Sequence, residues 1–71
     1  MNKVLLEFTL NGHKHTFFKR FDIYGDVITT NNKQNARTIK EQDVPGVLKK
    51  LVLQFGKENI KDVKPIKSDE N

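Results

Sequence analysis

The segment 43–56 constrains the fold more than any other part of the chain, because its apolar residues recur at helical spacing. They fall at i, i+3, i+4, i+7, i+8 and i+11, and they are Val44, Val47, Leu48, Leu51, Val52 and Phe55. This spacing puts them on one face of an α-helix, and another element must cover that face. Asp43 and Pro45 suit the start of such a helix and Gly56 suits its end, so we predict a helix over about 44–56.

The N-terminal segment predicts a β-hairpin. Its even-numbered residues from Val4 to Leu10 are apolar and alternate with a mixed set, which is typical of a strand with one buried face. Asn11-Gly12 follows, and this dipeptide accepts the positive φ angles of a type I′ turn. We therefore expect a second strand that runs from His13 or His15 toward Tyr24.

The length of the hairpin loop decides which residues of the second strand face the core. A loop of two or four residues places Phe17, Phe21 and Ile23 on the core side, whereas a three-residue loop places Phe18 and Arg20 there. We expect the even loop, since it buries more apolar side chains.

The remaining segments complete a small α+β domain over residues 1–67, in which an antiparallel meander of three to four strands packs against the helix. We expect further short strands at 27–30 and 36–40, while 60–66 fits either a strand or an extended segment. Residues 68–71 are expected to form a disordered tail. The predicted core comprises Val4, Leu6, Phe8, Phe17, Phe21, Val47, Leu48, Leu51, Val52 and Phe55.

Composition limits the classes of function. The chain has 71 residues and no cysteine, which excludes a disulfide framework and a thiolate zinc site and fits a cytoplasmic protein. No apolar segment approaches the ~20 residues of a membrane-spanning helix. A chain this short buries only about 60% of the surface that its unfolded form exposes, so we expect no small-molecule pocket, and dimerisation would supplement its stability.

Candidate catalytic and metal-binding groups are sparse. His13 and His15 would share one face of a strand, but no third ligand stands at a recognisable spacing. Asp22 and Asp26 flank Gly25 in a pattern that is typical of solvated turns. We therefore expect a protein that is not an enzyme and that binds no cofactor or metal.

Two binding hypotheses remain, and each uses a different set of residues. In the first, a protein-interaction or assembly module binds a protein partner or forms a homodimer through an apolar face turned away from the core. The candidates for this face are Leu5, Phe18 and Tyr24. In the second, thirteen Lys and Arg against nine Asp and Glu give a net charge of +4 that favours nucleic acid. The phosphate-contacting candidates are then Lys19, Arg20, Lys33, Arg37 and Lys40.

The run from Leu6 to Gly12, followed by Thr16-Phe17, resembles the N-terminal hairpin of many small bacteriophage and mobile-element proteins, including tail-assembly proteins. The resemblance covers under a third of the chain and assigns no functional residue. A three-stranded sheet packed by one helix is also similar to the arm-type DNA-binding modules of some integrases, which implies nucleic acid by fold analogy. We lean toward protein interaction, because the positive charge is spread over helix, loop and tail.

Overall fold

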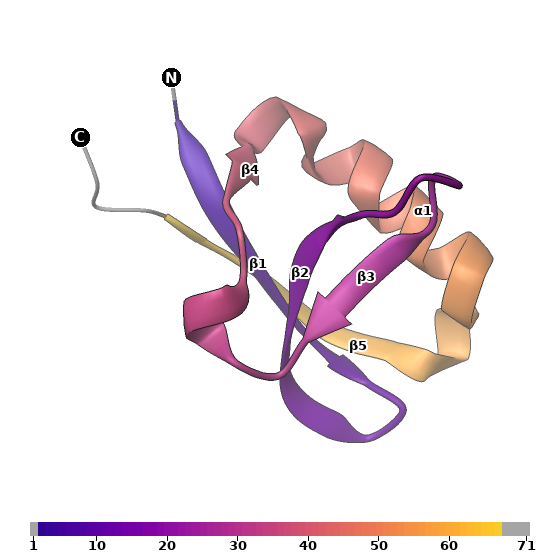
Figure 1. Cartoon of the computed structure of the whole chain (residues 1–71). Helices are drawn as coiled ribbons and strands as arrows, with labels where there is room; N and C mark the ends of the chain where they lie inside the picture. The colour runs from indigo at the N-terminus through magenta and orange to yellow at the C-terminus, as the bar shows by residue number, and fades with distance from the viewer. Residues whose placement is uncertain (1, 68–71) are drawn as a thin grey trace.

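The computed structural model describes residues 2–67, which form a five-stranded antiparallel sheet with one helix on one face (Figure 1). The predicted α+β class is confirmed; the predicted tail at 68–71 lies outside the described residues. The strands are β1 (Lys3–Leu10), β2 (His13–Phe21), β3 (Val27–Thr30), β4 (Ile39–Lys40) and β5 (Ile60–Lys67). The helix is α1 (Val44–Phe55), and the short 3₁₀ helices are η1 (Lys33–Asn35), η2 (Glu41–Asp43) and η3 (Lys57–Asn59). No helix in the described range is long and apolar enough to cross a membrane.

Strand β1 is the centre of the sheet and pairs with three other strands. Glu7 pairs with Phe17 of β2 and with Lys64 of β5, so β2 and β5 lie on opposite edges of β1. Val4 pairs with Ile39 of β4 and with Lys67 of β5, so β4 shares an edge of β1 with β2.

Strands β1 and β2 separate beyond the Glu7–Phe17 pair, and β4 enters between them. It pairs with the first residues of β1, and just before it the Arg37 N–H donates a hydrogen bond to the Phe18 carbonyl at 3.4 Å. Figure 1 shows β4 beside β1, with the segment that carries η1 connecting it to β3. The segment between β3 and α1 thus ties the two diverging strands together.

The hairpin turn forms as predicted, but the register of β2 shifts by one residue. Asn11 and Gly12 both have positive φ, as a type I′ turn requires, and Leu10 pairs with His13. A β-bulge follows, at which His15 adopts a φ of 60°, and the next pair is Phe8 with Thr16. The bulge adds one residue to β2, so the side chains that directly follow it change face relative to the prediction.

The bulge places Phe18, not Phe17, on the face that packs against α1. Phe18 is 4% exposed and belongs to a core cluster with Leu6, Phe8, Val27, Val47 and Leu51. A second bulge between Phe18 and Arg20 then returns Phe21 to this face, where its ring contacts Phe18 edge to face at 5.2 Å. Phe17 is buried on the opposite face of the sheet. The prediction that an even loop fixes the inward residues was therefore wrong for Phe17 and Phe18.

The helix follows its predicted range closely. Val47 and Leu51 are buried against the sheet, while Leu48 and Phe55 are partly buried; the predicted core residue Val52 is 40% exposed. Asp43 makes no capping bond through its side chain, since the 3₁₀ turn η2 leads directly into α1. Gly56, with φ 93° and ψ 138°, ends the helix as predicted.

The segment 60–66, which the sequence predicted as either a strand or an extended segment, belongs to strand β5. It is an edge strand that pairs with β1 along its length, and Pro65 lies on it where a missing N–H is tolerated. Asp62, with φ 54°, marks a bulge, and Lys61, Lys64 and Lys67 are exposed. Bulges, prolines and lysines are the features that keep an edge strand from pairing with another chain.

Candidate functional site

The apolar face predicted from Leu5, Phe18 and Tyr24 does not exist as an exposed surface. Phe18 is in the core cluster because the bulge at His15 turned it inward. Leu5 is 9% exposed on the other face of the sheet, opposite Ile66 of β5. Only Tyr24, at 82% exposure, is free to meet a partner.

The exposed apolar residues cluster elsewhere, around the turn that joins β2 to β3. Ile23 is 90% exposed and, with Tyr24, stands on this turn, while Phe21 at the end of β2 is 43% exposed. Phe21 was predicted to be a core residue and Ile23 to lie on the core side of the second strand, but Ile23 lies beyond the end of β2, where the chain has left the sheet. The other large apolar residues that are exposed in the described chain are Val52, Leu53 and Val63.

The turn 22–26 is held rigidly by its own hydrogen bonds. One carboxylate oxygen of Asp22, Oδ1, accepts from the backbone N–H groups of Tyr24 at 2.8 Å and of Asp26 at 2.9 Å. The Asp22 N–H donates in turn to the Asp26 carbonyl at 2.9 Å. The aspartates predicted to be turn formers thus fix the backbone that presents Ile23 and Tyr24 to solvent.

Helix α1 anchors this turn through one side chain. Gln54 accepts a hydrogen bond from the Val27 N–H at 2.6 Å and donates one to the Val27 carbonyl at 2.9 Å. Its amide therefore pairs with the outer edge of β3 as a neighbouring strand would. Figure 1 shows the turn lying against α1, in agreement with these bonds. Nothing in the sequence indicates this role for Gln54, since a glutamine on a helix is usually solvated.

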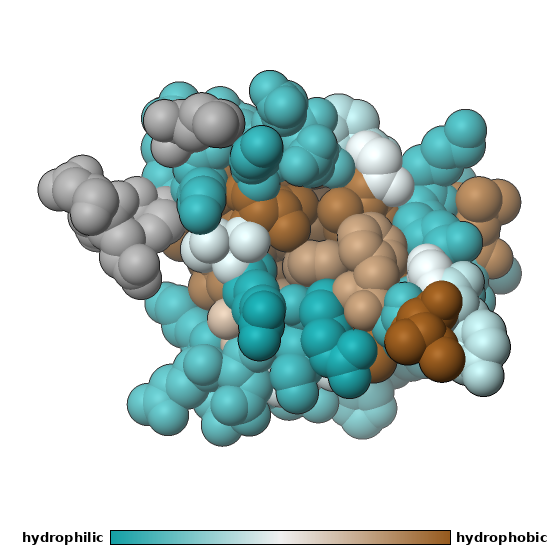
Figure 2. Space-filling model, turned by 45° about the horizontal axis from the view of Figure 1, so that its top comes forward, coloured by the Kyte–Doolittle hydropathy of each residue, from teal (hydrophilic) through white to brown (hydrophobic). Residues whose placement is uncertain are grey.

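An apolar hollow lies next to the turn, between β2 on one side and β4 and α1 on the other. Figure 2 shows apolar residues gathered in this hollow and framed by hydrophilic ones. The partly exposed apolar residues of these elements include Phe21 at the end of β2, Ile39 on β4 and Val44 at the start of α1. All three rest on the core: Ile39 and Val44 pack against the core cluster, and Phe21 contacts Phe18.

The structure brings together only part of the predicted phosphate-binding set. The Arg37 main chain bonds to Phe18, so Arg37 lies beside the segment that carries Lys19 and Arg20. Arg20 is exposed and donates from Nη1 to the Phe21 carbonyl at 3.3 Å. Lys40 pairs with Lys3 of β1, and Lys33 starts η1.

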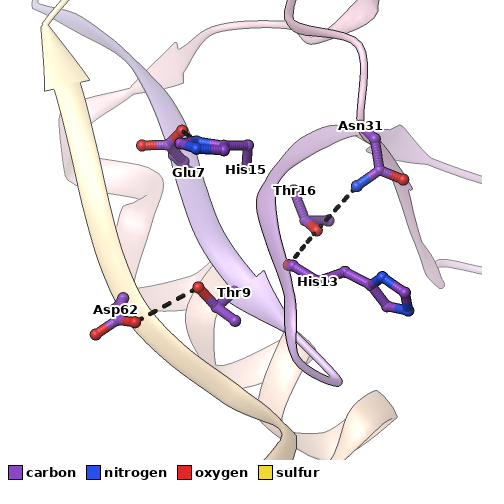
Figure 3. Close-up of polar contacts among 7 residues, drawn as sticks. All are labelled: Glu7, Thr9, His13, His15, Thr16, Asn31 and Asp62. Carbon is purple, nitrogen blue, oxygen red and sulfur yellow. Dashed lines mark hydrogen bonds and ion pairs between the residues drawn. The ribbon is translucent and has the colours of Figure 1, made fainter.

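A second, polar site lies on the sheet face that α1 does not cover. It is an open pocket of about 230 Å³, smaller than the roughly 300–1,000 Å³ of most ligand pockets. Figure 3 shows two of its contacts: His15 Nδ1 lies 2.8 Å from Glu7 Oε2, and the Thr9 hydroxyl donates to Asp62 Oδ2 at 3.5 Å. The lining is completed by Phe8, Lys14 and Lys64.

Two bulges build this polar pocket. His15 on β2 and Asp62 on β5 both have positive φ, and they flank the same part of β1 from opposite edges. Bulges commonly re-aim side chains in this way. The His15 side chain is 77% exposed and the Glu7 side chain 20%, so the imidazole stands in water at an open pocket and lacks the shielding that strengthens acid–base groups in a closed cleft.

His13 and His15, which the sequence would place on one face of a strand, make separate contacts. His15 contacts Glu7, whereas the His13 carbonyl accepts from the hydroxyl of buried Thr16 at 3.0 Å, and Asn31 donates to the same hydroxyl at 3.2 Å (Figure 3). Within residues 2–67, no group of three or more His, Cys, Asp or Glu side chains is arranged to hold a metal ion.

Comparison of the chain with models of protein families, with curated proteins and with solved structures yields no match. Inferences about function therefore rest on the residues and surfaces described above.

Proposed function

We propose that the protein is a non-catalytic protein-interaction module that binds its partner through the turn 22–26 and the adjacent apolar hollow. The observation that carries the proposal is the rigid presentation of Ile23 and Tyr24 in water. A surface that is already ordered loses little conformational freedom on binding, so more of the apolar burial appears as affinity. Tyrosine and other large apolar side chains are the usual anchors of interfaces.

The exposed apolar residues of the turn are not isolated, because an apolar hollow lies beside them. Phe21 leads into the turn, and the hollow beside it offers a concave complement to a partner's side chain. Single exposed apolar residues are normal on a soluble protein, whereas a projection next to an apolar hollow is typical of an interaction site.

Site-specific photo-crosslinking in the cells that make the protein tests this proposal. A photoreactive phenylalanine analogue replaces Ile23 in one variant and Lys61, on the exposed edge strand β5, in a matched control. We expect a discrete protein adduct from position 23 and none of the same mass from position 61. Absence of any adduct from position 23, in a variant that keeps the native amide spectrum, would contradict the proposal.

Nucleic-acid binding is the second candidate, favoured by the hydrogen bond that places Arg37 beside Lys19 and Arg20. Amide NMR titrations with a short duplex and with a single strand, at low and high salt, test it. Electrostatic binding predicts shifts at 19–20 and 33–40 that vanish at high salt, with a log-log slope of about −0.9 for each duplex phosphate neutralised. Unchanged spectra at low salt would remove this candidate and leave the protein-interaction proposal in place.

A further inference from the structure

We propose that the polar pocket on the sheet face away from α1 is a binding site for a single phosphate group. Its lining includes no residue of the turn 22–26 and none of the apolar residues named for the hollow, so the site goes beyond the proposed interaction surface and does not depend on it. Two observations carry the proposal: strained backbone positions that meet at the pocket, and positive charge inside it that has no partner.

The strained positions are His15 and Asp62. Outside the hairpin turn, they are the only non-glycine residues within 2–67 that have positive φ, at 60° and 54°. Each belongs to a bulge, and both bulges interrupt the pairing with the same stretch of β1, residues 7–10. Left-handed backbone at such residues costs free energy and clusters at functional sites, where bulges re-aim side chains. Two such positions that converge on one pocket indicate a binding site.

The two carboxylates of the pocket already have partners (Figure 3). Glu7 Oε2 lies 2.8 Å from His15 Nδ1, and Asp62 Oδ2 accepts a long hydrogen bond of 3.5 Å from the Thr9 hydroxyl. Since an ionised carboxylate only accepts, Nδ1 of His15 carries the proton in its pair with Glu7, and Nε2 stays available to a ligand. When both ring nitrogens are protonated, the imidazole donates to Glu7 and to a bound anion at once.

The lysines of the pocket have no such partners. Within residues 2–67, Lys14 and Lys64 make no ion pair and no side-chain hydrogen bond, although Lys64 lies directly opposite Glu7. Lys61, opposite Thr9 on the same face, adds a third positive charge beside them. The charge left without a partner is therefore positive, and it attracts an anion.

The arrangement of the donors suits a phosphate group better than a carboxylate. Lys14 and His15 belong to β2 and Lys64 to β5, so they reach a ligand over β1 from both sides. A phosphate group offers three strong acceptor oxygens and a charge of about −2 to such a set, more than a carboxylate does. The pocket, at about 230 Å³, is smaller than those that enclose drug-sized ligands, so it suits a single group.

Amide NMR titration of the full chain with inorganic phosphate, against sodium chloride at matched ionic strength, tests the site. We expect saturable shifts at 7–9, 14–15 and 61–64, with a dissociation constant of about 1 mM. Lys64→Gln should raise this constant about tenfold, because one charge-assisted hydrogen bond is lost. Lys49→Gln is the matched control: it makes the same change of charge on α1, outside the pocket, and should leave the constant unchanged. Both lysines are exposed, so both variants should keep the native amide spectrum.

A short DNA duplex without terminal phosphates distinguishes the two sources of such a group. If only inorganic phosphate shifts the pocket residues, the site takes a free or terminal phosphate; if the duplex shifts the same residues as phosphate does, the site takes backbone phosphates of nucleic acid. Phosphate shifts no larger than those with chloride, or equal dissociation constants for Lys64→Gln and Lys49→Gln, would overturn the proposal. Crosslinking at position 23 tests the turn 22–26 separately, so the two proposals can fail independently.

Discussion

Gln54 shows how much of this fold depends on one polar side chain. Its amide satisfies both the N–H and the C=O of Val27, groups that would otherwise face water or a foreign strand at the edge of the sheet. The same two bonds fix the start of β3, and hence the end of the turn 22–26, against α1. A polar side chain thus positions the apolar turn.

Replacing Gln54 with Ala is expected to lower the free energy of unfolding by about 1–3 kcal/mol, since two hydrogen bonds near the core are lost together. Urea denaturation followed by circular dichroism measures this change. Gln42→Ala is the matched control, because Gln42 is exposed in η2 and makes no side-chain bond within the described chain. Equal effects of the two substitutions would show that the Gln54 amide contributes nothing beyond helix propensity.

The two bulges of β2 decide which aromatic residues of this strand enter the core. Sequence patterning found the strand, its turn and the apolar face of the first strand, because those depend on alternation and on Asn-Gly alone. Sequence patterning failed at Phe17-Phe18. Either of these two identical neighbours can face the core, and one inserted residue decides which of them does. His15 carries no signature of a bulge, so the shift is visible only when the partner strand is in place.

Phe18→Ala should therefore destabilise the protein far more than Phe21→Ala. Phe18 is 4% exposed within the core cluster, and removal of a buried phenylalanine costs about 3–5 kcal/mol; Phe21 is 43% exposed, so about 1–2 kcal/mol is expected. Thermal and urea unfolding of the two variants, in the same buffer, gives the comparison. A stable Phe18→Ala variant would mean that the β2 register lacks the bulge at His15.

Helix α1 was the most predictable element, and its end offers a further test. Gly56 has φ 93° and ψ 138°, and a Cβ there would lie 3.1 Å from Glu58 Oε1. Gly56→Ala should therefore cost about 1–3 kcal/mol from backbone strain, as measured by urea unfolding. Gly46→Ala is the control with the opposite expectation: Gly46 lies inside α1 with open space around it, so alanine should stabilise the helix. Equal effects would show that the Gly56 conformation is not required.

The whole molecule is organised around β1, which is paired on both edges, whereas β3 and β5 are edge strands. The sequence did not predict this order, because Ile60, Val63 and Ile66 are too widely spaced to show that β5 lies along β1. The predicted exposed apolar face was wrong for a related reason: whether Leu5 or Phe18 is exposed depends on which strand covers each face, and that is a property of the assembled sheet.

Hydrogen exchange should reflect this arrangement. Backbone amides of β1 are expected to exchange most slowly, near the limit set by global unfolding, while β4 and the segment that carries η1 should exchange through local opening at lower free energy. Native-state exchange followed by NMR measures each residue separately. If the amides of β4 are as strongly protected from exchange as those of β1, then β4 unfolds only together with the rest of the protein.

The pairing of β1 with β5 also determines when the protein can fold during its synthesis. The hairpin and α1 emerge from the ribosome in order, but one whole edge of the central strand has no partner until residue 67 has left the exit tunnel. Contacts between residues so far apart close late and slow the folding rate. The nascent chain therefore carries an open, β-competent edge until β5 has been synthesised, and the lysines, proline and bulge of β5 protect the sheet only once that strand has docked.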